Sequence, residues 1–202
     1  MEIALFGGTF DPPTLAHEAI IDTILARKDI DELWVMPSAS RRDKPDMTDE
    51  QTRLRMLRQL KKESFNDNPR VKISTFEIDL PYATETYKTY DALKRVYPND
   101  TFMFVYGADS YGDMPNWRHG KRLQRTMGML LVDRVGYTLP EESATIRHLR
   151  VPAAIKLHTS STEVRTAVSD GQDYADLVSK SVAAFILSND LYRQSTMDVC
   201  KL

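Results

Sequence analysis

Short apolar runs rich in branched residues alternate along this 202-residue chain with longer segments of helical periodicity, and this alternation restricts the fold more than any other feature. The pattern is typical of parallel strands joined by crossover helices. The apolar runs predict strands over residues 2–6, 32–36, 71–75, 101–106, 129–133 and 155–158. We therefore expect a doubly wound α/β fold with a mostly parallel sheet and flanking helices, in which ligands bind beyond the carboxyl ends of the strands.

Four segments between or after these runs are predicted to be helical. The first covers residues 14–28, where apolar residues recur on one face: Leu15, Ala19, Ile20, Ile24 and Leu25. Thr48 and Gln51 have the spacing of a capping box, which predicts a second helix with leucines on one side and solvated basic side chains on the other. Two more helices are predicted over residues 86–97 and 182–191.

Length and charge limit the classes of protein to which the chain can belong. A chain of this length usually forms one domain, so we expect a single domain over residues 1–202, with 175–202 as a C-terminal helical segment. The 27 basic and 29 acidic residues give a net charge of −2, without the positive excess that favours nonspecific binding to nucleic acid or to anionic membranes. We therefore expect no nucleic-acid partner and no membrane partner.

The N-terminus and the cysteine content indicate where such a chain works. The N-terminus has no basic segment of the kind that precedes a secretory signal, and no apolar run approaches the roughly 20 residues that span a bilayer. Cys200 is the only cysteine, so an intrachain disulfide and a four-cysteine zinc site are both excluded. We expect a cytoplasmic protein.

The first predicted strand ends in two glycines, Gly7 and Gly8, and is followed by a helix. Glycines at this point let a ligand approach the backbone, and the free N–H groups of the helix can bind a phosphate, although an ordinary turn would have the same residues. Thr14 is a good N-cap, and His17 lies one turn into the helix, where its imidazole could face the same ligand or could simply pack.

A second anion site is indicated near the other end of the chain. Ser160 and Glu163 have capping-box spacing, so Ser161 and Thr162 would present N–H and hydroxyl groups at a helix N-terminus close to Arg165. A capped helix that carries a surface arginine is the alternative. Two phosphate-like sites, each after a strand, favour a triphosphate ligand.

Between these two sites, Gly107 and Asp109 follow the most hydrophobic strand, and Trp117 comes shortly afterwards. A carboxylate at this point can accept hydrogen bonds from a ribose or an adenine, and an indole can stack on a planar ring, although Trp117 could equally pack in the core. The basic residues of the 41–44 loop could form a clamp for phosphates or an ordinary exposed cluster.

Four motifs in order, GGTFDPPTLAH, YGADS followed by NW, DRVGY and SSTEVR, resemble those of the nicotinate and nicotinamide mononucleotide adenylyltransferases of the nucleotidyltransferase superfamily. The resemblance extends from Ala4 to Arg165 and is greatest to the bacterial nicotinate-mononucleotide type. The family's HxGH motif is Thr14-Leu15-Ala16-His17 here. Related adenylyltransferases also carry threonine at the first position, and the methyl group of Ala16 is expected to affect ATP binding more than the reaction.

The resemblance implies a Rossmann-like nucleotidyltransferase fold and an enzyme of NAD biosynthesis. It would transfer AMP from ATP to nicotinate mononucleotide, giving deamido-NAD and pyrophosphate, with Mg²⁺ carried by the ATP phosphates and a homo-oligomer compatible with the sequence. By position, the catalytic residues would be His17, Thr14, Lys44 and Arg165, with Arg42 as an alternative to Lys44. The residues that would bind ATP are Gly7, Gly8, Thr9, Phe10, Gly107, Asp109, Ser161 and Thr162. The residues that would bind the mononucleotide are Thr89, Trp117 and Arg134. No protein ligand to a metal is expected.

Two other functions are compatible with these residues. The acceptor could be nicotinamide mononucleotide or another phosphate such as phosphopantetheine, although Trp117 and the chain length argue against the latter. The chain could also be a nucleotide-binding module without turnover, which only the departures at Thr14 and Ala16 favour. Acyl- or phospho-enzyme chemistry is not indicated, because no nucleophile with an adjacent base is evident.

Overall fold

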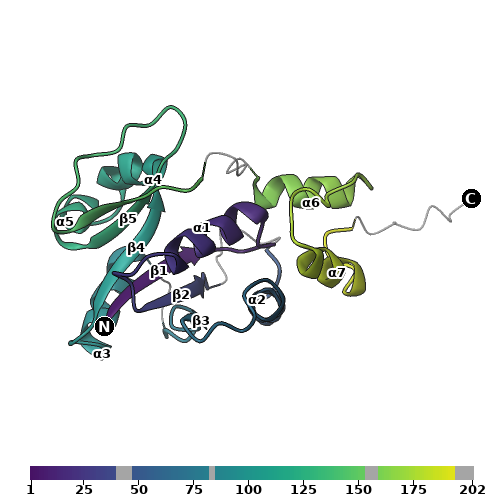
Figure 1. The fold of residues 1–202 in the computed structure, drawn as a ribbon, viewed down its shortest axis with the longest axis horizontal. Helices are drawn as coiled ribbons and strands as arrows, with labels where there is room; N and C mark the ends of the chain where they lie inside the picture. Colours follow the sequence, from purple (N-terminus) through teal and green to yellow (C-terminus); the bar gives the residue numbers. More distant parts are fainter. Residues whose placement is uncertain (40–46, 82–84, 153–158, 194–202) are drawn as a thin grey trace, which may run out of the picture.

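The computed structural model describes residues 1–39, 47–81, 85–152 and 159–193. Its centre is a six-stranded sheet in the order β3-β2-β1-β4-β5-β6, and all neighbouring strands are parallel (Figure 1). The strands are β1 (Glu2–Gly8), β2 (Glu32–Pro37), β3 (Val71–Ile73), β4 (Thr101–Gly107), β5 (Gly128–Val132) and β6 (Ile146–Leu149). The strand order reverses between β1 and β4, which confirms the doubly wound fold and marks the position where ligands bind in such sheets.

Five of the six strands lie where the apolar runs predict them, and the sixth does not. The segment 155–158 lies outside the described residues. The strand β6 was not predicted, because Arg147 and His148 interrupt its apolar character. An edge strand has a neighbour on one side only, and Arg147 forms ion pairs there with Glu2 and Asp29, both at 3.2 Å.

The helices form one layer on each face of the sheet. Alternate residues of a strand point to opposite faces, so Ala4 and Phe6 of β1 contribute to one core and Ile3 and Leu5 to the other. The first core is covered by α1 (Leu15–Leu25), α2 (Glu50–Ser64), α6 (Ser161–Ser169) and α7 (Lys180–Ser188). The second is covered by α3 (Thr86–Val96), α4 (Ala108–Asp113), the 3₁₀ turn η1 (Met114–Asn116) and α5 (Gly120–Thr126).

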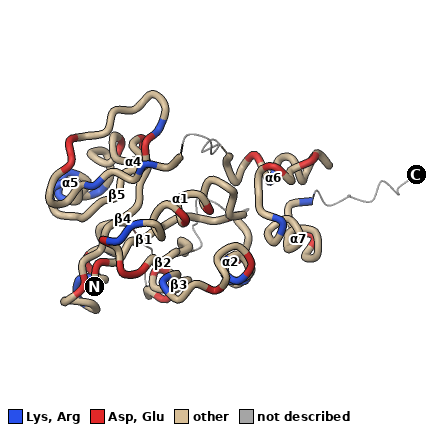
Figure 2. The backbone as a smooth tube through the Cα atoms, viewed as in Figure 1, with Lys and Arg blue, Asp and Glu red and all other residues tan. Residues whose placement is uncertain are grey.

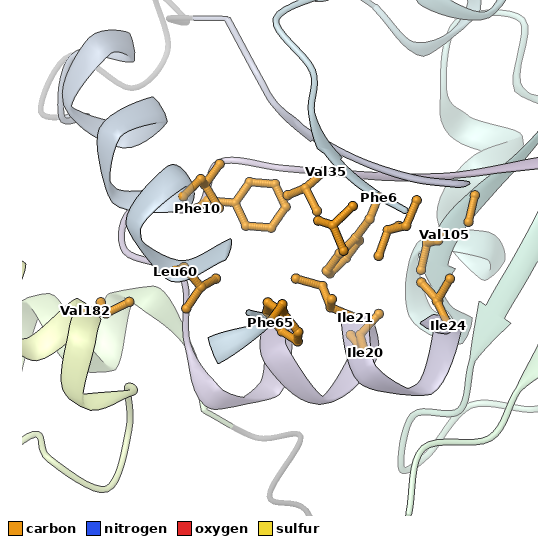
Figure 3. Close-up of a cluster of buried hydrophobic side chains, with 14 of the residues drawn as sticks. Phe6, Phe10, Ile20, Ile21, Ile24, Val35, Leu60, Phe65, Val105 and Val182 are labelled. Carbon is orange, nitrogen blue, oxygen red and sulfur yellow. The ribbon is translucent and has the colours of Figure 1, made fainter. Parts of the chain in front are cut away.

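The helix α1 packs its apolar face on the centre of the sheet. Ile20, Ile21 and Ile24 point toward Phe6 and Val35 of the strands, as Figure 3 shows. The periodicity predicts this face correctly at three of five positions, while Leu15 is exposed and Leu25 is only partly buried. The helix ends three residues before the predicted boundary.

The start of α2 differs from the prediction. Asp49 is the N-cap, and its carboxylate accepts a hydrogen bond from the Thr52 N–H at 2.9 Å, so the predicted capping box at Thr48 is wrong by one residue. The expectation that the basic side chains of α2 are solvated holds for Arg55 and Arg58 but is wrong for Arg53, which is completely buried.

Basic and acidic residues are interspersed along the described backbone (Figure 2). Within the described ranges, none of the helices has the length and apolar character needed to cross a membrane. The helix α7 falls within the predicted C-terminal segment 175–202 and packs against α2, at the end of the molecule away from the N-terminus (Figure 1).

Candidate active site

A cavity of about 270 Å³ opens at the carboxyl ends of β1, β2 and β4, where the strand order reverses. Gly7, Gly8 and Thr9 line one side, and residues of β2, β4 and α3 line the rest: Met36, Ser38, Thr86, Thr89, Phe104, Val105 and Tyr106, together with Leu5 and Glu77. A Cβ atom on Gly7 would meet nothing within 4 Å, so the backbone there is open to a ligand.

His17 does not line this cavity but lies in α1 against the loop after β1, in a defined protonation state. The Thr14 N–H donates to its Nδ1 at 2.9 Å, so Nδ1 carries a lone pair and the neutral ring has its proton on Nε2. The ring packs between Phe6 and Phe10, at centroid distances of 5.9 and 5.1 Å. Burial, and secondarily the positive charge of Arg134, lower the pKa of His17 to about 4, so the ring is neutral at pH 7.

The two predicted anion sites are in direct contact. Ser160 caps α6 through the predicted capping box with Glu163. The Ser161 hydroxyl donates to the Pro12 carbonyl at 2.7 Å, and Nη1 of Arg165 donates to the Asp11 carbonyl at 2.7 Å. The N-terminus of α6 is therefore seated against the loop that follows β1.

Two further bonds extend this contact. The Thr14 hydroxyl lies within hydrogen-bond distance of both His17 Nδ1, at 2.8 Å, and the Thr159 carbonyl, at 3.3 Å, which joins the N-cap of α1 to the residue before the N-cap of α6. Nη2 of Arg165 donates to the Thr162 hydroxyl at 3.2 Å. His17 and Arg165, which are 148 positions apart in the chain, thus belong to one hydrogen-bonded assembly.

Gly107 ends β4 and brings Asp109 and Arg134 together. A Cβ atom on Gly107 would lie 2.2 Å from Oδ1 of Asp109 and 3.2 Å from Nε of Arg134, so a larger residue here would displace the Asp109 carboxylate. Asp109 lies in the first turn of α4, and Arg134 is close enough for its charge to lower the pKa of His17. Arg134 therefore lies on the His17 side of the site.

Thr89 and Tyr106 line the other side of the cavity, and Trp117 packs against Tyr106. Thr89 is 2% exposed, and its hydroxyl is buried without a hydrogen-bond partner although it lines the cavity. Burial raises the pKa of Tyr106 to about 12. Its ring meets the half-buried Trp117 edge to face at 5.6 Å, and the Trp117 indole N–H donates to Asp113 at 3.1 Å.

Some predicted residues have other surroundings. The side chain of Phe10 is 1% exposed and belongs to the core, which leaves only its backbone for a ligand. Lys44 and Arg42 lie outside the described residues. The described part of the chain contains no group of three or more His, Cys, Asp or Glu side chains that could hold a metal ion.

Sequence reasoning missed Ser38, Tyr106 and Arg53. The Ser38 hydroxyl is buried without a hydrogen-bond partner and lines the cavity, and its position directly after β2 was an available signal. The buried guanidinium of Arg53 donates to the carbonyls of Thr9, Ser38 and Thr48 at 2.8–2.9 Å. It joins the loops after β1 and β2 to the start of α2.

Comparisons with known proteins identify the family of this chain. Residues 5–167 match the cytidylyltransferase-like family model. The chain is 31% identical to the probable nicotinate-nucleotide adenylyltransferase of Thermus thermophilus, over 96% of this chain and 100% of that protein. It is 30% identical to the nicotinate-nucleotide adenylyltransferase of Bacillus subtilis, over 95% and 98% of the two chains.

A solved structure has the same fold. The nicotinic acid mononucleotide adenylyltransferase of Plasmodium falciparum complexed with NaAD superposes with a TM-score of 0.81 and is 25% identical, over 95% of this chain and 97% of that one.

Proposed function

This chain belongs to the cytidylyltransferase-like family and groups within it with the nicotinate-nucleotide adenylyltransferases, and we propose that it transfers AMP from ATP to nicotinate mononucleotide, releasing pyrophosphate. The observation that carries the proposal is the seating of α6 against the loop after β1. This seating gathers a neutral imidazole, a helix N-terminus and a guanidinium around the loop after β1, and the start of that loop, Gly7 to Thr9, lines the cavity. Such a set of donors suits a polyphosphate whose charge changes during reaction.

The proposed reaction requires positioning and charge stabilisation rather than a strong base. A phosphate oxygen of the mononucleotide attacks the α-phosphorus of ATP, one P–O bond forms, and the bond to the β-phosphate breaks as pyrophosphate leaves. The attacking oxygen is already anionic, so no proton has to be removed from it. Holding the two phosphates in line and stabilising the developing negative charge then supply the catalysis.

We assign to His17 the role of a neutral hydrogen-bond donor. The Thr14 N–H fixes Nδ1 as an acceptor, so Nε2–H is the group available to an ATP phosphate. Arg165 and the α6 N-terminus with Ser161 and Thr162 would bind the β- and γ-phosphates. Lys44 would add a cation to the same phosphates.

The remaining residues divide between the two halves of the dinucleotide product. Gly107 and Asp109 would bind the adenosine half, with Asp109 accepting hydrogen bonds. Thr89 and Trp117 would bind the pyridine half, a role that the unpartnered hydroxyl of Thr89 in the cavity supports. We place Arg134 near the phosphate of the mononucleotide, since its charge already acts on His17.

Magnesium enters this proposal as part of the substrate, MgATP. Its preferred ligands are oxygens, and the triphosphate supplies them, so the cation would neutralise charge on the leaving pyrophosphate. The donor set described here consists of N–H, hydroxyl and cationic groups, which bind the phosphates and not the cation.

The test is pyrophosphate release from MgATP, with nicotinate mononucleotide, nicotinamide mononucleotide, phosphopantetheine or no acceptor at equal concentrations. We expect release with nicotinate mononucleotide and none without an acceptor, and the ratio of kcat/KM values gives the acceptor preference. A preference for phosphopantetheine, or no release with any acceptor from protein that binds ATP, would contradict the proposal.

A further inference from the structure

We propose that Tyr192, which follows α7 and lies outside every motif named above, is a positioning residue for ATP. It acts on the loop after β1 through the carboxylate of Asp11. The inference rests on the proposed function, because it assigns ATP phosphates to this loop and to Arg165. It concerns a residue that contributes no atom to the cavity.

The contact joins the two ends of the chain. The Tyr192 hydroxyl donates to Oδ1 of Asp11 at 2.7 Å, across 181 positions of sequence. The other carboxylate oxygen of Asp11 accepts the Thr48 N–H at 3.0 Å. Asp11 is 3% exposed, so its carboxylate depends on these protein donors in place of water.

Asp11 is also the residue to which the second anion site is attached. Its backbone carbonyl accepts the 2.7 Å hydrogen bond from Arg165, and the next carbonyl, that of Pro12, accepts the bond from Ser161. A shift of Asp11 would therefore move Arg165 and the start of α6 relative to the Gly7–Thr9 side of the cavity. A displacement of this kind alters phosphate binding more than it alters the pyridine side.

The backbone conformation around Tyr192 directs its hydroxyl toward Asp11. Asp190 and Tyr192 both have left-handed φ angles, 51° and 63°, which are unfavourable for residues other than glycine and turn the chain back after α7. Burial and the negative charge of Asp11 raise the pKa of Tyr192, so the phenol stays protonated and remains a donor at every pH at which the protein would work. The Thr48 side chain also hydrogen-bonds to the phenol, so the two residues that donate to the Asp11 carboxylate contact each other as well.

The experiment compares Tyr192→Phe with Tyr174→Phe. Tyr174 also follows α6 and packs against the same core, and no described hydrogen bond involves its hydroxyl, so the control loses the same atom. We would measure the Kd of ATP by calorimetry without acceptor, the KM values of ATP and nicotinate mononucleotide, kcat, and the Tm of each variant.

For Tyr192→Phe we expect the Kd and KM of ATP to rise about three- to tenfold, the range that follows from losing one hydrogen bond to a carboxylate. The KM of the mononucleotide should change less than twofold, as should every constant of Tyr174→Phe. A lower Tm with an unchanged ATP affinity would mean that Tyr192 is merely structural and would overturn the proposal.

A second comparison tests the route through Asp11. In an Asp11→Ala background, which removes the acceptor of the Tyr192 hydroxyl, Tyr192→Phe should have no further effect on the ATP Kd, and an undiminished effect would contradict the route. The calorimetric measurement of ATP binding also separates the proposed role of Tyr192 from the proposed adenylyl transfer. A wild type that binds ATP but transfers no AMP would remove the proposed function, while the effect of Tyr192→Phe on ATP binding would still be measured.

Discussion

Acidification should destabilise this protein through His17. The pKa of this imidazole is lowered from 6.5 to about 4 by burial and by Arg134. Between these two values the unfolded chain binds a proton that the folded chain does not, so stability rises with pH across this window. The contribution is fully present above pH 6.5 and is lost as the pH falls to about 4. Protonation also removes the lone pair that accepts the Thr14 N–H.

The magnitude follows from the two pKa values. At 1.36 kcal/mol per pH unit, lowering the pKa from 6.5 to about 4 corresponds to about 3 kcal/mol of unfolding free energy between neutral pH and pH 4. A domain of ordinary stability would lose a large part of its unfolding free energy of roughly 5–15 kcal/mol.

The assay is urea unfolding of the wild type and of His17→Asn at several pH values from 4 to 7. Asparagine cannot titrate, and its Oδ1 can accept the Thr14 N–H in place of Nδ1, so other titrating groups cancel in the difference between the two proteins. The wild type should lose about 3 kcal/mol relative to the variant as the pH falls. A difference that changes by less than about 0.5 kcal/mol across this range would refute the reasoning. Imidazole ¹⁵N NMR checks the tautomer independently, since Nε2 should carry the proton at pH 7.

Three further predictions concern single side chains, each checked by one measurement. His17→Ala should lower kcat by about 10²- to 10³-fold in steady-state assays, as expected for the loss of one preorganised hydrogen-bond donor. The circular dichroism spectrum should match that of the wild type. A kcat within a few-fold of the wild-type value would show that His17 does not donate to the ATP phosphates. Arg53→Met should reduce the unfolding free energy in urea by about 3 kcal/mol, because three partly buried carbonyls lose their donor. A loss below about 1 kcal/mol would show that water or other donors replace the guanidinium. Gly107→Ala should raise the KM of ATP at least about tenfold, because the Cβ atom of the alanine would displace Asp109. An unchanged KM of ATP would show that adenosine does not bind at Gly107 and Asp109.

The features that were predictable from sequence are local. The glycines at the end of β1, the N-cap Thr14 and the position of His17 one turn later are fixed by residues within about ten positions of one another. The capping box at the start of α6 is local in the same way. The order of the parallel strands then places both segments at one edge of the sheet, so the fold itself unites them.

The features that were missed depend on distant partners. Arg53 has the same sequence context as its exposed neighbours on α2, and its burial is decided by carbonyls at Thr9 and Ser38 that its own helix does not specify. The strand β6 contains charged and polar residues, which an edge strand tolerates. In the sequence these residues break the apolar pattern, so the segment is predicted as a loop. Tyr192 carries no motif, and its role is visible only once Asp11 is seen beside it.

The contact between Tyr192 and Asp11 has a consequence for how the chain is made. During translation, Tyr192 is added 181 residues after Asp11, which takes roughly 10 to 40 seconds at ordinary elongation rates. During that interval the loop after the first strand exists without its last partner, and Arg165 also arrives late. The nascent chain can therefore assemble most of its sheet before this loop has all its contacts. A chain that ends before Tyr192 would lack one of the two donors to Asp11 in the loop to which we assign phosphate binding.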